Sequence, residues 1–347
     1  MQTNSEKAFH NQSIECCKLL AAFFIVLIHI HLPGSTGLLM NALGRFSVPM
    51  FFAISGYFSF SISGKKIAKR LIHIIYLTFI AIAMCLFWNF LKSILQGNSI
   101  IHSLKPRYLS LRELSDWVFL HINPFYGHLW YLTAVAVCYC VLWVYVTFYG
   151  KEKVNYLPLY LMSAMLFAIR YSCAELMQFG GGNLPYYFFR DGWFFGLPMF
   201  SMGLFLHEHQ DRIIQNFHLT TLRQLLLLIA GSLLSILPWK AYGYISELPL
   251  GAVVQTVALL LLTTGHPCIL GTSRFSTQVT QLLGYLSTAI YLLHLLVDEA
   301  YVLFFQSKVT SLLNTHIELW LHPFLVILFS ILLAFAFRLV SSLFKRI

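Results

Sequence analysis

The sequence of 347 residues has few charged side chains. Lys, Arg, Asp and Glu together make up 10% of it, whereas a soluble domain carries about 25%. Hydrophobic residues make up 58%, and long apolar runs with few charges are typical of integral membrane proteins. The shortage of charge excludes a soluble enzyme, a disordered chain and a conventional nucleic-acid-binding protein.

Cysteine pairs with the CxxC spacing are also missing. The seven cysteines are scattered, and none belongs to a CxxC pair. Cys138 and Cys140 lie two residues apart in an apolar run, so on a helix they face different sides. We therefore expect the cysteines to act as small apolar residues, with no disulfide framework and no metal site.

The apolar runs are continuous and do not alternate with the period of two that a strand requires. They predict an all-α fold, a polytopic bundle of about ten transmembrane helices in one membrane-embedded domain, residues 1–347. The expected spans are 17–32, 48–62, 71–95, 128–148, 155–170, 192–207, 222–238, 247–264, 282–305 and 320–340. Several are shorter than the roughly 20 residues that cross a bilayer squarely.

The net charge of +10 comes from Lys and Arg in the loops between these runs. If the N-terminus is cytoplasmic, the inner loops collect more of the 23 basic residues than the outer loops do. This asymmetry predicts that both termini are cytoplasmic. The inner cations suit anionic membrane lipids, and some of them could also bind a phosphorylated cosubstrate.

Two ionisable residues stand out in the first span, where such groups mark a functional site or a buried pair. Lys18 and His29 are eleven residues apart, so they share a helix face with a rise of about 16 Å between them. That rise matches the reach of a pantetheine arm. Lys18 could hold a nucleotide phosphate while a thioester reaches His29, a candidate general base. Alternatively, Lys18 snorkels and His29 is a satisfied core histidine. Glu15 could pair with Lys18 across one turn.

The second span ends in small residues followed by a basic loop. Ser55 and Gly56 would let another helix or a ligand chain approach closely. Ser55 is a weak candidate nucleophile because it lacks a G-x-S-x-G frame. In the loop, Lys66 and Arg70 are one helical turn apart. They could grip a phosphate or anchor the cytoplasmic side of the span.

Three further positions carry polar or aromatic groups at span ends or within a span. Trp130 belongs to an aromatic pair that is typical of an interface belt. Arg190 and Asp191 could form a rim pair or bind an acceptor. Tyr291 and His294 lie at i, i+3, where the histidine could bridge helices or carry a proton.

In their order along the chain, these motifs resemble the acyltransferase-3 family of bacterial integral-membrane O-acyltransferases. The motifs are Glu15-x-x-Lys18 followed by His29, the run 51–57 that ends in Tyr57, the basic loop 65–70, and the runs 129–132 and 291–294. The family pattern has Arg or Lys, ten residues and then His, which Lys18 and His29 match. Glu15 stands where Asp is usual in the family, and Lys66 and Arg70 match its basic pair.

The resemblance implies an enzyme of the bacterial cytoplasmic membrane. The donor would be acyl-CoA, with acetyl as the default, and no cofactor would be bound tightly. The acceptor would be a hydroxyl of an extracytoplasmic glycan, lipid or other surface molecule. The predicted catalytic residues are His29, Lys18 and Glu15; the predicted substrate-binding residues are Lys66, Arg70, Ser55, Tyr57, Trp130, Arg190, Tyr291 and His294.

The runs 127–131 and 190–200 are also similar to the membrane part of serine racemases linked to vancomycin resistance. In those proteins a pyridoxal-phosphate racemase domain follows the membrane part, and this sequence ends at Ile347 without one. If the sequence is a fragment of a longer protein, serine uptake without acyl-transfer chemistry is the alternative function.

Overall fold

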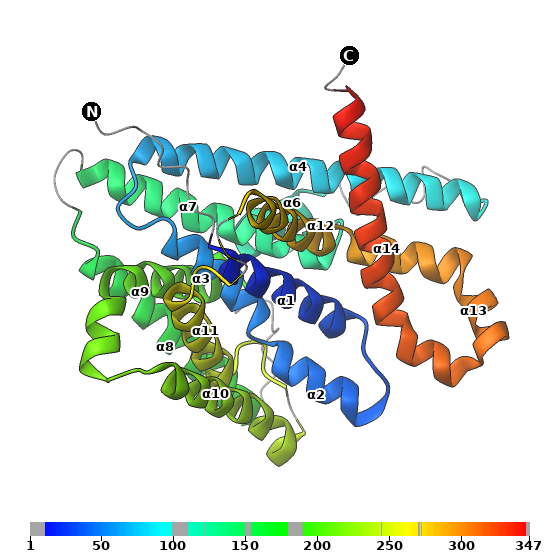
Figure 1. Ribbon diagram of the computed structural model, residues 1–347. Helices are drawn as coiled ribbons and strands as arrows, with labels where there is room; N and C mark the ends of the chain where they lie inside the picture. Colours follow the sequence, from blue (N-terminus) through cyan, green and yellow to red (C-terminus); the bar gives the residue numbers. More distant parts are fainter. Residues whose placement is uncertain are drawn as a thin grey trace. The chain divides into compact units, whose positions relative to one another are not determined.

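The computed structural model describes residues 11–98, 110–121, 123–149, 154–179, 190–243, 245–269, 271 and 273–344. Within these ranges every regular element is a helix (Figure 1). The α-helices are α1 (Gln12–His29), α2 (Gly34–Gly44), α3 (Ser47–Tyr57), α4 (Gly64–Leu95), α6 (Leu111–Leu120), α7 (Trp130–Tyr149), α8 (Leu157–Phe179), α9 (Leu197–Asn216), α10 (Thr221–Tyr242), α11 (Leu250–Gly265), α12 (Arg274–Phe304), α13 (Gln306–Leu313) and α14 (Thr315–Phe344). The 3-10 turn η2 (Gly127–Leu129) precedes α7, and the π-helical turn η4 (Gly192–Gly196) precedes α9. The predicted all-α class is confirmed.

Among the described residues, seven helical segments are long and apolar enough to cross a membrane. They are Gln12–His29, Gly34–Tyr57, Gly64–Leu95, Gly127–Tyr149, Thr221–Ala241, Arg274–Phe304 and Thr315–Val340. The shorter apolar helices Leu157–Cys173 and Leu250–Gly265 fall on two more of the predicted spans, and η4 with α9 falls on the remaining one. The chain is a multi-pass membrane protein.

Two boundaries differ from the predicted ones for local reasons. Helix α1 begins at Gln12 and not at residue 17, because the Asn11 side chain caps it by accepting a hydrogen bond from the backbone N–H of Ile14. The segment expected to connect the first two spans contains α2. The glycines of α2 lower its hydropathy, so the apolar runs did not predict this helix. Its residue Gly37 packs closely, since an added Cβ would lie 1.9 Å from the Leu32 carbonyl oxygen.

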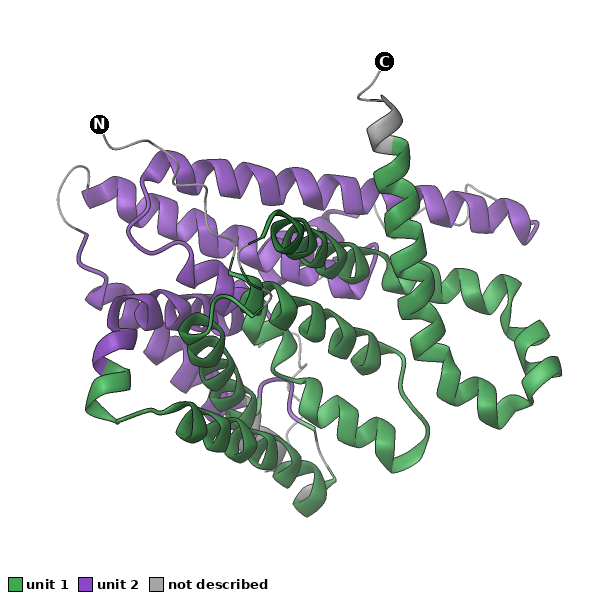
Figure 2. Ribbon diagram, in the orientation of Figure 1, with its two compact units in different colours: residues 1–51, 213–245, 249–347 green, residues 52–212, 246–248 purple. Residues whose placement is uncertain are grey.

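The chain divides into two compact units (Figure 2). Unit 1 comprises residues 1–51, 213–245 and 249–347, and unit 2 comprises residues 52–212 and 246–248. Within unit 1, α1 packs along α12, α12 packs on α14, and α10 packs on α11. Within unit 2, α4 packs along α7, and both α7 and α8 contact η4.

Small residues bring helices into backbone contact inside each unit. In unit 2, a Cβ added to Gly56 of α3 would lie 1.8 Å from the Phe200 carbonyl oxygen of α9. The close approach that the sequence predicts at Gly56 is therefore confirmed. In unit 1, a Cβ added to Gly251 of α11 would lie 2.3 Å from the Gly231 carbonyl oxygen of α10. Such contacts suit membrane bundles, where close packing replaces the hydrophobic effect between helices.

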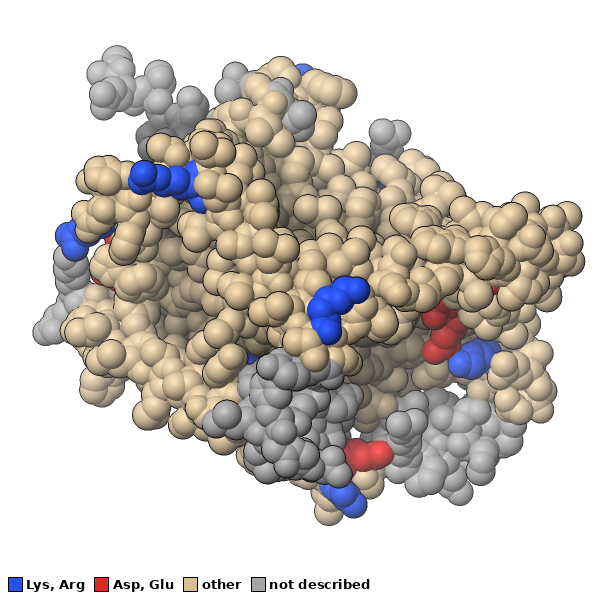
Figure 3. All heavy atoms as spheres, turned by 90° about the horizontal axis from the view of Figure 1, so that it is seen from below, with Lys and Arg blue, Asp and Glu red and all other residues tan. Residues whose placement is uncertain are grey.

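The surface fits a lipid environment. Apolar side chains are exposed along α4, where Ile72 is 65% and Phe79 is 64% exposed. Charged side chains are few and scattered on the face shown in Figure 3. A soluble monomer rarely exposes such extended apolar area, whereas hydrocarbon chains of lipid cover it without cost.

Candidate active site

The N-terminal half of α1 carries an ion pair that faces α12. Lys18 Nζ lies 2.8 Å from Glu15 Oε2, and both side chains are mostly buried. The predicted pairing across one turn is therefore confirmed. Gly284 of α12 lies opposite, and a Cβ added there would come within 2.5 Å of Glu15 Oε2. The missing side chain at Gly284 gives the carboxylate its room beside Lys18.

The C-terminal end of α1 brings two imidazoles together. His29 is the last residue of α1 and is partly buried. Its ring centroid lies 5.3 Å from that of His294 on α12, with the planes tilted by 37°. His294 is fully buried, and its Nδ1 lies 2.9 Å from the Tyr291 carbonyl oxygen. A proton on Nδ1 would be donated to that carbonyl, which would direct Nε2 away from the backbone of α12.

A cluster that sequence reasoning missed lies one turn beyond His294. His322 Nε2 of α14 lies 2.8 Å from Asp298 Oδ1 of α12, and His322 Nδ1 lies 3.9 Å from Glu318 Oε1. Glu318 is 1% exposed and accepts a hydrogen bond of 3.0 Å from the Tyr301 hydroxyl. The signal was present as two i, i+4 pairs, His294 with Asp298 and Glu318 with His322. The cluster fixes α12 against α14, next to the paired imidazoles.

Ser55 and Tyr57 anchor α3 within unit 2. Ser55 hydrogen bonds to Tyr131 of α7. The Tyr57 hydroxyl donates to Gln210 Oε1 of α9 at 3.0 Å, and its ring packs against His207. These contacts hold the close interface between α3 and α9, whereas His29 and His294 belong to unit 1.

The predicted phosphate grip, Lys66 and Arg70, lies at the start of α4 in unit 2. Arg70 Nη1 donates to the Phe58 carbonyl oxygen at 2.7 Å and to Ser59 Oγ at 2.9 Å. Arg70 thus satisfies a carbonyl just beyond the C-terminal end of α3. Lys66 is exposed. Phosphate binding by the two side chains stays a prediction.

Trp130 and Arg190 lie together in unit 2. The Arg190 guanidinium carbon lies 5.2 Å from the centroid of the Trp130 ring, a cation–π distance. Trp130 is only 5% exposed, so it belongs to the core and not to a lipid-facing belt. Arg190 Nε lies 3.9 Å from Glu247 Oε2. Asp191, the partner considered for Arg190, instead caps η4 by accepting from the backbone N–H groups of Trp193 and Phe194.

Buried titratable groups that sequence reasoning missed surround this cap. His121 Nδ1 accepts a hydrogen bond of 3.2 Å from the Gly192 backbone N–H. Burial lowers the pKa of His121 to about 4 and raises the pKa of Asp191 to about 6. Arg170, 1% exposed, places its guanidinium carbon 5.6 Å from the Phe195 ring centroid. Only contacts made by the folded chain reveal these groups, since each stands alone in its sequence context.

His121 predicts a pH dependence of stability. Its folded pKa of about 4 lies below the unfolded value of 6.5, so its neutral form stabilises the fold above pH 6.5 and this stability is lost as the pH falls towards 4. Asp191, with a raised pKa, acts in the opposite direction over an overlapping range. Wild type loses this contribution between pH 7.5 and pH 4, whereas His121→Gln has no imidazole to protonate. We therefore expect the free energy of unfolding of His121→Gln minus that of wild type to be about 3 kcal/mol larger at pH 4 than at pH 7.5. Denaturant unfolding of both proteins in detergent at both pH values measures this difference. A difference that is the same at pH 7.5 and pH 4 contradicts the prediction.

The described structure defines a class: a helical, multi-pass membrane protein with a paired-imidazole site on the helix that also carries a mostly buried Lys–Glu pair. A family comparison then assigns the chain. The acyltransferase-3 family model, described as an acyltransferase domain, matches residues 11–339, so the chain belongs to this family and is a membrane acyltransferase. The match runs through both compact units. Neither a search of curated proteins nor a search of solved structures found a match.

Proposed function

We propose that this acyltransferase moves an acyl group, acetyl by default, from cytoplasmic acyl-CoA to a hydroxyl of an extracytoplasmic glycan, lipid or other surface molecule. One observation carries the proposal: His29 of α1 lies against His294 of α12, with 5.3 Å between ring centroids. Lys18 lies three helical turns earlier on α1. One helix thus carries both Lys18, a cation that could bind a phosphate of the donor, and His29, a base that could take the proton of the acceptor hydroxyl.

The proposed chemistry has His29 as the reacting imidazole. As a general base, His29 takes the proton of the acceptor hydroxyl while the oxygen attacks the thioester carbonyl. The carbon–sulfur bond breaks, and the CoA thiolate takes the proton from His29. As a carrier, His29 would first attack the thioester carbonyl itself; the carbon–sulfur bond breaks, and the CoA thiolate takes the imidazole proton. The acceptor hydroxyl would then attack the acyl group, the bond between acyl carbon and imidazole nitrogen breaks, and the hydroxyl proton returns to the imidazole. His294 orients His29 in both routes, and Glu15 holds Lys18 in place.

Lys18 gives a prediction on donor affinity. We expect Lys18→Gln to raise the KM for acetyl-CoA at least about tenfold, because a hydrogen bond to a charged group contributes about 1.5–3 kcal/mol. The kcat should fall much less than the KM rises, since Lys18 touches no reacting atom. Lys308→Gln, which removes an exposed cation from α13, serves as the control. An unchanged KM in Lys18→Gln contradicts the phosphate role.

Mass spectrometry of surface glycans and lipids tests the proposed function as a whole. Bacterial cells with and without the protein are compared, and the proposal expects one class of surface molecule to lose an acyl group when the protein is absent. The protein itself should fractionate with the cytoplasmic membrane. Unchanged surface molecules, together with protein-dependent serine uptake by vesicles, would replace the proposal with the transport function.

A further inference from the structure

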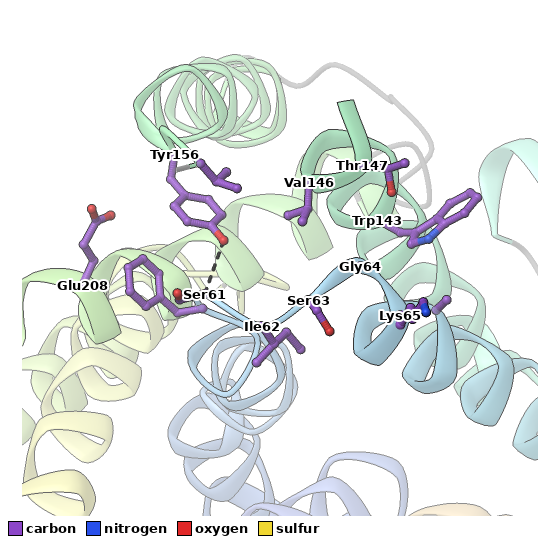
Figure 4. A pocket seen from close by; sticks show the side chains of 13 residues that line it. Ser61, Ile62, Ser63, Gly64, Lys65, Trp143, Val146, Thr147, Tyr156 and Glu208 are labelled. Carbon is purple, nitrogen blue, oxygen red and sulfur yellow. Dashed lines mark hydrogen bonds between the residues drawn. The ribbon is translucent and has the colours of Figure 1, made fainter. Parts of the chain in front are cut away.

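The neighbours of the paired imidazoles in unit 1 include further ionisable side chains. His29 and His294 both belong to this unit, as does the cluster of two carboxylates and one imidazole between α12 and α14. The cavity of about 680 Å³ in Figure 4 is instead lined by residues of unit 2, from Lys65 to Glu208. Ionisable groups in a membrane-spanning segment are costly and usually serve a function, so we expect the cluster in unit 1 to do more than join two helices.

The cluster carries more negative than positive groups. His322 Nε2 lies 2.8 Å from Asp298 Oδ1, and its Nδ1 lies 3.9 Å from Glu318 Oε1. Among the residues that the structure describes, neither carboxylate forms an ion pair with a lysine or an arginine. When both carboxylates are ionised, at least one negative charge therefore remains uncompensated, even if His322 is protonated.

The two carboxylates differ in what they can act on. Glu318 is 1% exposed and accepts a hydrogen bond of 3.0 Å from the Tyr301 hydroxyl. Asp298 lies four residues after His294 on α12, so the two side chains are neighbours on one face of the helix, and they interact electrostatically. The His322 ring that binds Asp298 is itself held, because it packs on the Tyr301 ring with centroids 4.6 Å apart. Asp298 is therefore the carboxylate whose charge acts on the paired imidazoles.

We propose that Asp298 is a positioning residue for the paired imidazoles. Its carboxylate, which His322 holds in place, stabilises the positive charge that forms when His29 takes the proton of the acceptor hydroxyl, as a carboxylate stabilises a catalytic imidazolium in hydrolases. A positive charge also forms in the carrier route, when the imidazole nitrogen attacks the thioester carbonyl. Asp298 acts through His294, the imidazole that packs against His29. For the reaction that it serves, this role rests on the proposed function.

Steady-state acetyl transfer by the purified full-length protein in nanodiscs, with a membrane extract as the source of acceptor, tests the role. Asp298→Asn keeps the shape of the side chain and an oxygen for His322 but removes the charge. Its kcat should fall at least about tenfold, while the KM for acetyl-CoA stays within about twofold of wild type. The matched control is Glu299→Gln, because the adjacent carboxylate lies on a different side of α12, and it should keep the wild-type kcat.

Asp298→Glu separates charge from packing. The glutamate keeps the negative charge but is one methylene longer, whereas the asparagine has the size of the aspartate. The proposal expects Asp298→Glu to retain a higher kcat than Asp298→Asn, and a role in packing alone expects the opposite order. If Asp298→Asn does not fold, Asp298→Glu still decides, since a kcat below about a tenth of wild type would overturn the proposal.

Nuclear magnetic resonance of the imidazole nitrogens, in protein labelled with ¹⁵N-histidine, tests the same role without turnover. We expect Asp298→Asn to move the signals of His29 and His294 more than Asp298→Glu does, and Glu299→Gln to leave them in place. Signals that stay in place in Asp298→Asn would overturn the proposal. If the signals move as expected but wild type transfers no acetyl group, the action of Asp298 on the imidazoles stands and the proposed function fails. If wild type transfers acetyl and Asp298→Asn keeps its kcat, the role of Asp298 fails and the proposed function stands.

Discussion

Replacing His29 with alanine is expected to lower the rate of acyl transfer by about 100- to 10,000-fold, the usual contribution of a general base. His29 lies at the end of α1 against His294, so its loss removes the imidazole that both proposed routes need. As an acyl carrier it would be indispensable, and the residual rate would then lie at the low end. Turnover of labelled acetyl-CoA by purified protein, at equal expression in the membrane, measures the effect.

His31 provides the matched control. It lies two residues after His29, is exposed, and its Nε2 is 3.0 Å from Asn41 Nδ2. His31→Ala removes the same side chain from the same part of the chain, and it should keep nearly the full rate. A His29→Ala protein that retains near wild-type turnover would remove His29 from the mechanism.

Replacing Gly203 with valine is expected to destabilise unit 2 by about 3 kcal/mol or more. A Cβ added to Gly203 of α9 would lie 1.9 Å from the Ala53 carbonyl oxygen and 2.8 Å from the Tyr57 backbone nitrogen of α3. Overpacking usually costs about 1–3 kcal/mol when side chains can yield. Here the clash is with backbone on a neighbouring helix, so α9 must separate from α3. Thermal unfolding in detergent, together with the yield of monodisperse protein, measures the loss.

Gly127→Ala is the control for this substitution. Nothing lies within 4 Å of a Cβ added at Gly127, and the residue starts the short turn η2. Its stability should stay within about 0.5 kcal/mol of wild type, as expected of a substitution without a packing effect. If Gly203→Val unfolds at the same temperature as wild type, that result contradicts the close backbone contact between α3 and α9 at Gly203.

Local patterns in the sequence predicted local features well. The continuous apolar runs predicted the long apolar helices but not α2, and the spacing of Glu15 and Lys18 predicted their ion pair because both residues lie on one turn. The small residue Gly56 predicted a close helix contact. Each of these follows from a few adjacent residues and the geometry of one helix.

Contacts between segments that lie far apart in the sequence could not be predicted from such local patterns. The approach of His29 to His294 depends on α12 packing along α1. Nothing in the sequence of α1 or of α12 indicates that these two helices pack against each other. Arg190 and Asp191 are neighbours in sequence, yet Arg190 lies near Glu247, whereas Asp191 caps a π-helical turn. The charges of two adjacent residues do not reveal that one of them caps a helical turn, so the different partners of Arg190 and Asp191 could not be predicted from the sequence.

Incubation of the purified protein with acetyl-CoA labelled in the acetyl group tests most directly whether α1 carries an acyltransferase site. We expect label to move to a hydroxyl-bearing acceptor, or to appear on His29 when no acceptor is present, and we expect neither in His29→Ala. Label that stays on CoA in the presence of membrane extracts containing the acceptors, with wild type and His29→Ala alike, would contradict the proposed chemistry.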